Sequence, residues 1–282
     1  MTTGCVPTPL LMGVVNVTPD SFSDGGRWLE PDAAIAHGRD LLAEGADILD
    51  VGGESTRPGA TRPVVEEELG RVIPVISALA TDGALVSVDP MRAEVAEAAL
   101  TAGATMVNDV SGGLADPRIL EVVAAAGAPY VAMHWRAHAD NMRDFAVYDG
   151  PDGVVGAVRD ELSERVEALL AAGIAHDRII LDPGLGFAKH GEHNWRLLRD
   201  LGPLRALGFP LLVGASRKSF LGSLLADAGG TARAVEQREH ANTALTVHLA
   251  QQGVWGLRVH DVRAARDALR VVERLSGEEQ RS

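Results

Sequence analysis

The sequence predicts an α/β protein with the (β/α)8 architecture of a TIM barrel. Three observations favour it: eight short apolar runs spread along the chain, amphipathic segments between them, and polar or charged residues where the runs end. Eight strand–helix units make up a closed barrel of this kind. A doubly wound open sheet is the alternative, and the number of strands alone does not exclude it.

The expected strands are continuous apolar runs rather than alternating ones, which is typical of parallel strands buried on both faces. They are Leu10–Val17, Ile48–Val51, Leu85–Val88, Met106–Val110, Tyr130–Met133, Ile179–Leu181, Leu211–Val213 and Leu257–Val259.

The segments between the runs carry apolar residues at helical spacing. The expected helices are Pro31–Glu44, Val64–Ala80, Met91–Ala102, Pro117–Ala126, Val154–Leu170, Asn194–Ala206, Glu239–Gln252 and Val262–Leu275. Pro31 and Pro117 suit first helical turns, and Gly45, Gly103, Gly127 and Gly173 suit helix ends. No stretch has the composition of a flexible linker, so residues 1–282 are expected to form one domain.

Composition excludes several classes of function. The net charge of −13 argues against non-specific nucleic-acid binding and against attraction to anionic membranes. The single cysteine, Cys5, excludes an intrachain disulfide and a cysteine zinc cluster. No apolar run approaches the ~20 residues of a membrane span, and the first nine residues lack the pattern of a signal peptide. We therefore expect a cytoplasmic protein with no nucleic-acid or membrane partner.

The ends of the expected strands are unusually polar. In a barrel these ends converge on one mouth, where the active site lies. Helix capping explains a single such residue about as well as function does, but it explains all eight strand ends poorly. The residues concerned are Asn16, Asp50, Asp89, Asn108, Asp109, His134, Asp182, Ser216, Arg217, Lys218, Arg258, His260 and Asp261.

These groups suit two ligand chemistries. Asp89, Asn108 and Asp182 match a flat, nitrogen-rich ring that carries donors and acceptors, because a carboxylate accepts two parallel N–H bonds from a guanidine-like edge. Lys218, Arg258 and His260 suit an anion, and Arg binds phosphate through a planar fork. The mouth is therefore expected to bind a heterocycle linked to a phosphate or diphosphate.

Two loops after the first two strands are longer than the usual 2–6 residues of a βα connection. They run from Thr18 to Gly26 and from Glu54 to Ala60, and both are rich in Gly, Pro, Ser and charge. Long loops at this end of a barrel are commonly lids or binding loops, which favours an enzyme.

Several segments resemble the signatures of the dihydropteroate synthase family. They are MGVVNVTPDSFSDGG (12–26), DVGGESTRPG (50–59), NDVSGG (108–113), DPGLGFAK (182–189), GASRKSFLG (214–222) and RVHD (258–261). The resemblance covers the chain from Leu11 to about Leu275, in order and spacing. One departure is Pro90, which follows Asp89 where the family usually has threonine; we expect little effect, because proline is tolerated at a first helical position.

The resemblance implies a folate-pathway transferase and target of sulfonamide drugs. The family joins 6-hydroxymethyl-7,8-dihydropterin diphosphate to p-aminobenzoate and releases diphosphate and 7,8-dihydropteroate. The resemblance implies three binding sites, each at residues that match the family's motifs. The pterin would be bound by Asp89, Asn108, Asp182 and Lys218, and the diphosphate by Asn16, Arg258 and His260. The p-aminobenzoate would be bound by Phe22, Thr56, Arg57, Pro58, Phe187 and Ser216.

The resemblance also implies Mg²⁺ at Asn16, and a homodimer formed through the last helices, for which Ala244, Leu245 and His248 are a candidate stripe. The same stripe could instead pack on the barrel. The leaving group is an anion and the pterin-attached carbon can become cationic, so Arg258 and Mg²⁺ would stabilise the anion and Asp24 the cation. The aniline amine is already nucleophilic and needs no strong general base.

Other readings of the sequence are weaker. Gly184-Leu-Gly186 lacks the third glycine of a dinucleotide site, and Gly214–Ser219 lacks the order of a Walker loop. The pairs His134/His138 and His190/His193 could ligate a metal but lie in or beside loops. A pterin-dependent methyltransferase would not need the anion site or the Thr56-Arg57-Pro58 loop, and an inactive paralogue would not retain nearly every motif residue.

Overall fold

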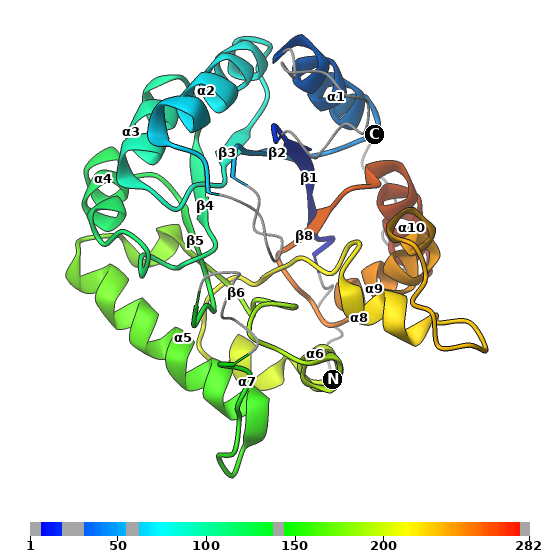
Figure 1. The fold of residues 1–282 in the computed structure, drawn as a ribbon. Helices are drawn as coiled ribbons and strands as arrows, with labels where there is room; N and C mark the ends of the chain where they lie inside the picture. Colours follow the sequence, from blue (N-terminus) through cyan, green and yellow to red (C-terminus); the bar gives the residue numbers. More distant parts are fainter. Residues whose placement is uncertain (1–6, 19–30, 55–61, 138–143, 277–282) are drawn as a thin grey trace.

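The computed structural model describes residues 7–18, 31–54, 62–137 and 144–276. Eight parallel strands form a central barrel with the helices outside it (Figure 1). The strands are β1 (Leu10–Asn16), β2 (Ile48–Gly52), β3 (Val86–Val88), β4 (Met106–Asp109), β5 (Tyr130–Met133), β6 (Ile179–Asp182), β7 (Leu212–Val213) and β8 (Gly256–Val259).

The α-helices within the described residues are α1 (Pro31–Ala43), α2 (Val65–Thr81), α3 (Ala93–Thr101), α4 (Arg118–Ala126), α5 (Gly153–Ala171), α6 (Gly191–Arg199), α7 (Gly202–Arg205), α8 (Ser219–Leu224), α9 (Glu239–Gln251) and α10 (Val262–Ser276). Short 3-10 helices cover His176–Arg178 and Val235–Gln237.

The strand order β6-β5-β4-β3-β2-β1-β8-β7 brings the two edge strands together. A parallel bridge joins Leu181 to Leu211, and the backbone N–H of Leu181 donates to the carbonyl of Pro210 at 2.9 Å. These bonds close the barrel and confirm the expected TIM-barrel architecture over an open sheet.

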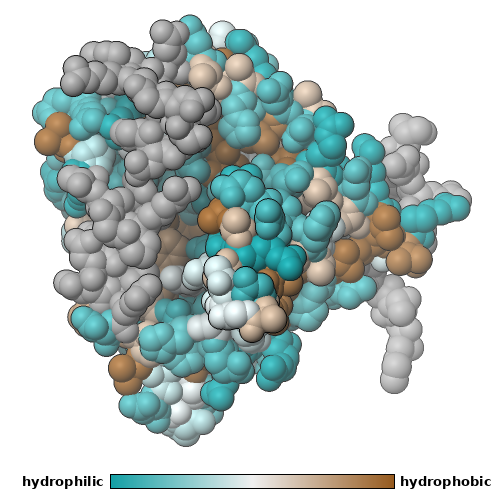
Figure 2. Space-filling view, turned by 45° about the vertical axis from the view of Figure 1, so that its right-hand side comes forward, coloured by the Kyte–Doolittle hydropathy of each residue, from teal (hydrophilic) through white to brown (hydrophobic). Residues whose placement is uncertain are grey.

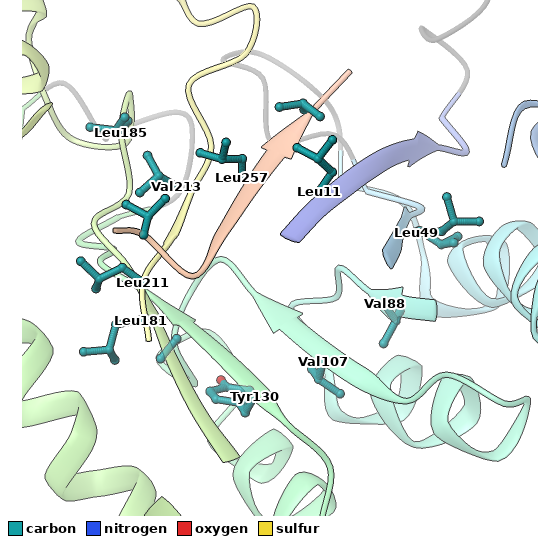
Figure 3. Close-up of a cluster of buried hydrophobic side chains, with 14 of the residues drawn as sticks. Leu11, Leu49, Val88, Val107, Tyr130, Leu181, Leu185, Leu211, Val213 and Leu257 are labelled. Atoms are coloured by element: carbon teal, nitrogen blue, oxygen red, sulfur yellow. The ribbon is translucent and has the colours of Figure 1, made fainter. Parts of the chain in front are cut away.

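Residues on the outer face of the strands form the main core. Leu11, Val107, Tyr130 and Leu257 come from four strands and are fully or almost fully buried against the helices (Figure 3). With helices on one side and the barrel interior on the other, both faces of each strand are buried. This explains why the strands are continuous apolar runs in the sequence.

The barrel interior has two layers. Its lower layer is apolar and consists of Met12, Ile48, Met106, Val131, Ile180 and Leu212. Because side chains on a strand alternate between its faces, the residue two positions later also points inward. At that position β2, β4 and β6 carry Asp50, Asn108 and Asp182. The interior therefore changes from apolar to polar towards the C-terminal ends of the strands.

The predicted elements agree with the structure to within one or two residues, except for α6 to α8. The single helix expected over Asn194–Ala206 is two helices, α6 and α7, because Asp200 is extended at the end of α6 and a new turn starts at Gly202-Pro203. The short helix α8 was not expected. Pro90 is not at a first helical position, because α3 begins at Ala93. Instead it follows Asp89 directly, and a residue before proline favours the extended conformation.

On the face shown in Figure 2, hydrophilic residues predominate and hydrophobic residues form small separate groups. Among the described residues, no helix combines the length and the apolar character needed to cross a membrane.

Candidate active site

The upper layer of the barrel is built around Asp50, which is fully buried. Its Oδ2 accepts hydrogen bonds from Asn108 Nδ2 at 2.9 Å and from Arg258 Nε at 2.6 Å. Strand register explains why Arg258 reaches Asp50: Arg258 is paired with Met12 on the neighbouring strand and therefore points inward, as Met12 does. The other carboxylate oxygen, Oδ1, is buried and has no hydrogen-bond partner among the described residues.

Arg258 also binds Asp89, the residue that follows β3. Its Nη2 donates to Asp89 Oδ2 at 2.9 Å. Burial raises the pKa of Asp89 to about 8, while the charge of Arg258 lowers it and the charges of Asp50 and Asp109 raise it. One guanidinium thus joins the carboxyl groups of Asp50 and Asp89 at the centre of the mouth.

Asp182 and Lys218 lie on the opposite side of this polar layer. Asp182 Oδ1 accepts the backbone N–H of Gly184 at 2.7 Å, and burial raises the pKa of its carboxyl group. Lys218 Nζ donates to the carbonyl of Leu185 at 2.6 Å. Burial lowers the pKa of Lys218 to about 8, against the opposing charge of Asp182.

The loop 184–189 forms one wall of the mouth and requires glycine at two places. Gly184 and Gly186 have φ of +67° and +79°. A Cβ atom on Gly184 would lie 2.3 Å from the carbonyl oxygen of His134, and one on Gly186 would lie 3.0 Å from Lys218 Cδ. The loop can therefore approach β5 this closely only without a side chain at residue 184, and the positive φ of both residues favours glycine.

Phe187 lies at the tip of the same loop. The ring has Lys218 Nζ 4.3 Å above its centroid and packs against a small cluster of Met91, Val110 and Met133. A cation over an aromatic face is an attractive arrangement that fixes both groups. Phe187 therefore presents an apolar surface beside the charged groups of the mouth.

Ser216 and His260 meet at the ends of β7 and β8. His260 Nδ1 lies 2.9 Å from Ser216 Oγ, and the same hydroxyl accepts the backbone N–H of His260 at 3.3 Å. Asn16 ends β1 and pairs with Gly52. Asn16 is four residues after the inward-facing Met12, so its side chain points to the same, inward face of β1.

The structure therefore brings together Asp89, Asn108, Asp182, Lys218 and Arg258, and it places Phe187 beside Lys218 and Ser216 beside His260. The predicted site residues Phe22, Asp24, Thr56, Arg57 and Pro58 lie outside the described residues.

Three strand-end residues do not face the mouth. Asp109 is on the outer face of β4, where it accepts bonds from Tyr130 Oη at 2.7 Å and from the backbone N–H of Gly113 at 2.8 Å. Asp261 accepts the backbone N–H of Ala264 and caps α10. His134 contacts Glu161 of α5. Expecting all polar strand ends to converge was wrong for these residues, since neighbours on a strand point to opposite faces.

A family model described as pterin binding enzyme matches residues 12–260. Dihydropteroate synthase of Mycobacterium leprae (strain TN) is 53% identical over 264 residues, which are 93% of this chain and 92% of the relative. The chain belongs to the pterin-binding enzymes, in the dihydropteroate synthase family. It is thus a transferase of folate synthesis.

Solved structures of dihydropteroate synthase from Xanthomonas albilineans are similar to this pterin-binding enzyme. A structure with 4-aminobenzoic acid has a TM-score of 0.86 at 46% identity and covers 96% of this chain and 94% of that chain. A complex with 7,8-dihydropteroate has a TM-score of 0.82 at 44% identity and covers 96% of this chain and 95% of that chain.

Two residues of this pterin-binding enzyme have a larger part in the site than the sequence indicated. In the sequence Asp50 is only one of the polar strand ends. It lies two positions after Ile48, which faces inward in the structure, and a continuous apolar run does not reveal that facing. In the sequence Lys189 is only the last residue of the motif 182–189. It is one of two lysines in the chain, and it is buried. No pattern in the sequence indicates its contact with His134, which directly follows β5 and is 55 residues away in the chain.

Proposed function

We propose that the upper layer of the barrel joins 6-hydroxymethyl-7,8-dihydropterin diphosphate to p-aminobenzoate through the residues expected from the sequence. The observation that carries the assignment is that Arg258 donates hydrogen bonds to the carboxyl groups of Asp50 and Asp89, beside Asp182 and Lys218, above the apolar lower layer of the barrel. This arrangement offers acceptors for a flat ring and cations for an anion within one mouth.

The pterin ring would lie between Asp89, Asn108, Asp182 and Lys218. Asp182 has one oxygen committed to Gly184, which leaves the other to accept from the guanidine-like edge of the ring. Asn108 uses its amide nitrogen on Asp50, so its carbonyl oxygen is the group left for a ring N–H. Lys218 would donate to an acceptor of the ring.

The diphosphate would be held by Arg258, His260 and Asn16. A Mg²⁺ ion fits this position, because it prefers oxygen ligands and is usually bound by one or two protein groups together with substrate phosphates. Asn16 offers an amide oxygen, and the described residues contain no cluster of three acidic, His or Cys side chains that would form a complete metal site. When bound, Mg²⁺ would offset the charge of the departing diphosphate.

The p-aminobenzoate would be bound by Ser216 and Phe187, together with Phe22, Thr56, Arg57 and Pro58. Phe187 supplies an apolar face for the benzene ring, and Ser216 is held in place by His260. The amine would then meet the carbon that bears the diphosphate.

The chain contributes orientation and electrostatics to the reaction. Arg258 is a half-buried cation at the mouth and would bind the anion that develops as the C–O bond breaks. Asp24 would stabilise the positive charge on the carbon. The amine of p-aminobenzoate attacks, the C–N bond forms, and the amine then loses a proton to solvent.

We also propose the setting in which this enzyme works. The whole chain, 1–282, would form one domain, located in the cytoplasm, and two copies would associate through the last helices. Of the candidate stripe, Ala244 is exposed, whereas Leu245 packs on the core and His248 Nε2 lies 2.9 Å from the carbonyl of Leu198. Only Ala244 would thus be left for a partner.

Asp182→Asn tests the pterin site. The amide keeps an oxygen for the N–H of Gly184, so the fold should survive, but it replaces a charged acceptor by a donor. The affinity for a pterin, measured by calorimetry, should fall by about 2–4 kcal/mol.

Asp109→Asn is the matched control, because this carboxylate is buried on the outer face of β4. It should lower stability and leave pterin affinity within twofold of the wild type. Pterin affinity within threefold of wild type in Asp182→Asn would remove Asp182 from the ring site.

A further inference from the structure

A chain of hydrogen bonds lies directly behind the mouth. Lys189 Nζ is 2.8 Å from His134 Nδ1, and His134 Nε2 is 2.9 Å from Glu161 Oε2. Arg136 binds the same carboxylate through Nε. The chain therefore runs from the loop 184–189, through the end of β5, to helix α5.

The protonation of this chain is fixed by its surroundings. Hydrogen bonds from His134 and Arg136 outweigh burial and lower the pKa of Glu161 to about 2, so its carboxylate only accepts. Burial and then the charge of Lys189 lower the pKa of His134 to about 4, so the ring is neutral near pH 7. His134 must therefore donate through Nε2 and accept through Nδ1, which makes Lys189 the donor to Nδ1.

Lys189 also reaches the wall of the mouth. Its Nζ donates to the carbonyl of Phe187 at 3.1 Å, and Phe187 lies beside Lys218 in the mouth. Lys189 thus ties the backbone of Phe187 to His134, at the end of another strand.

The segment that Lys189 holds is strained. Ala188 lies between Phe187 and Lys189 with φ of +46°, in the left-handed region that side chains rarely adopt. Its carbonyl accepts from Tyr148 Oη at 2.9 Å. A strained residue persists only where its surroundings hold it, and such residues cluster at functional sites. Here bonds from Lys189 and Tyr148 hold the backbone on either side of the strained position.

We propose that Lys189 is a positioning residue for p-aminobenzoate binding: through His134 and Glu161 it fixes the backbone of Phe187, and so the apolar wall against which p-aminobenzoate packs. The proposal rests on the proposed function, because it takes Phe187 to contact p-aminobenzoate. In this proposal Lys189 acts through Phe187 and not by contact with either substrate. Of the proposed pterin groups, Asn108 and Asp89 are held by Asp50 and Arg258, which do not belong to this chain of bonds, whereas Lys218 lies over the Phe187 ring.

Lys189→Met is the first test, because it keeps the length of the side chain and removes its donors. The KM for p-aminobenzoate should rise by about tenfold, and the KM for the pterin diphosphate should rise by clearly less, because Asp89 and Asn108 do not depend on Lys189. The kcat should stay within about threefold. An unchanged KM for p-aminobenzoate in a folded variant would overturn the proposal, whether or not the melting temperature falls.

A pair of variants at His134 tests the direction of the bond and serves if Lys189→Met does not fold. His134→Asn keeps an oxygen near the place of Nδ1 and should retain most of the affinity for p-aminobenzoate. His134→Gln places its amide near Nε2, loses the acceptor for Lys189, and should raise the KM for p-aminobenzoate by about fivefold or more. The reverse order of the two variants would contradict the proposal. His176→Gln, at an exposed histidine outside the mouth, should change neither KM.

Phe187→Ala separates this proposal from the proposed function. If it raises the KM for p-aminobenzoate while Lys189→Met does not, the site assignment stands and the positioning role fails. If Phe187→Ala leaves that KM unchanged, the assignment of Phe187 fails, and the positioning role fails with it. In a double-mutant cycle, Lys189→Met should add little to Phe187→Ala, because both act through one ring.

Discussion

Arg258 has two carboxylate partners in the mouth, and they differ in exposure. Asp50 is wholly buried, whereas the side chain of Asp89 keeps 14% of its surface accessible. A guanidinium that is largely withdrawn from water is stabilised by an opposite charge, which Asp50 provides whether or not substrate is present. Asp89 is the partner that a ligand can reach. A diphosphate that binds Arg258 would weaken the hydrogen bond from Arg258 to Asp89 and leave the carboxyl group of Asp89 available to the pterin ring.

The raised pKa of Asp89 predicts a pH dependence of stability. Its carboxyl group keeps a proton up to about pH 8 in the folded protein but releases it near pH 4 when unfolded. The folded state thus binds more protons between these values, so the free energy of unfolding should fall as pH rises from 4 to 8, by at most about 1.4 kcal/mol per pH unit from this group.

Asp89→Asn should remove this contribution, so the difference in stability between variant and wild type should change with pH. Urea unfolding of both proteins at pH 5.5, 6.5 and 7.5 measures it. A difference that stays constant across these values would show that Asp89 is already ionised in the folded protein.

At the scale of elements, the alternation of side chains on the strands decides which polar residues reach the mouth. Asp50, Asn108 and Asp182 each follow an inward-facing apolar residue by two positions. Asp109 is one residue further along β4 than Asn108 and therefore points to the outer face. Strand positions were predictable because continuous apolar runs mark buried parallel strands. Which residues of each strand point into the barrel was not predictable, because a continuous apolar run has no alternation that would distinguish its two faces.

Contacts between elements distant in the sequence were the other part that could not be predicted. The motif 182–189 is recognisable in the sequence, but the contacts that fix its conformation are not. They come from His134, Glu161 and Tyr148, and they depend on how β5, α5 and the segment before α5 pack. Similarly, the Gly202-Pro203 signal between α6 and α7 was present in the sequence, but helical spacing on both sides concealed it.

The closeness of the loop 184–189 to β5 predicts the effect of Gly184→Ala. The added Cβ would lie 2.3 Å from a backbone oxygen at a φ of +67°, so the loop must move. Stability should fall by about 2–4 kcal/mol, and the KM for p-aminobenzoate should rise.

Gly127→Ala is the matched control for this substitution. Gly127 has a similar φ of +62°, but nothing lies within 4 Å of the added Cβ. Only the backbone strain of about 1 kcal/mol should then appear, with unchanged activity. Equal losses in both variants would show that the close approach at Gly184 carries no extra free energy. Thermal unfolding and steady-state kinetics provide both readings.

At the scale of the whole molecule, the two substrate sites are built differently. The proposed pterin site consists of residues on the rigid barrel, whereas much of the proposed p-aminobenzoate site comes from the Thr18–Gly26 and Glu54–Ala60 loops. Those loops hold few large apolar residues, so burial offsets little of the ordering entropy of about 1–2 kcal/mol per residue. Diphosphate and Mg²⁺ at the mouth would give Arg57 and Asp24 charged partners and favour closed loops.

A sulfonamide should therefore bind at least about tenfold more tightly when diphosphate and Mg²⁺ are present, and by linkage it should tighten diphosphate binding equally. Calorimetric titration with and without both partners tests this. Equal affinity under the two conditions would mean that the second site is already formed in the empty enzyme.

The most direct measurement is the formation of 7,8-dihydropteroate from the two substrates by purified wild-type protein and by the Asp182→Asn variant. With Mg²⁺ present, the wild type should release one diphosphate for each dihydropteroate formed. The variant should lose about 100-fold or more of kcat/KM for the pterin substrate, while it unfolds at nearly the same temperature. Absence of product from the folded wild type, or full activity in the variant, would contradict the assignment of the barrel mouth as the catalytic site.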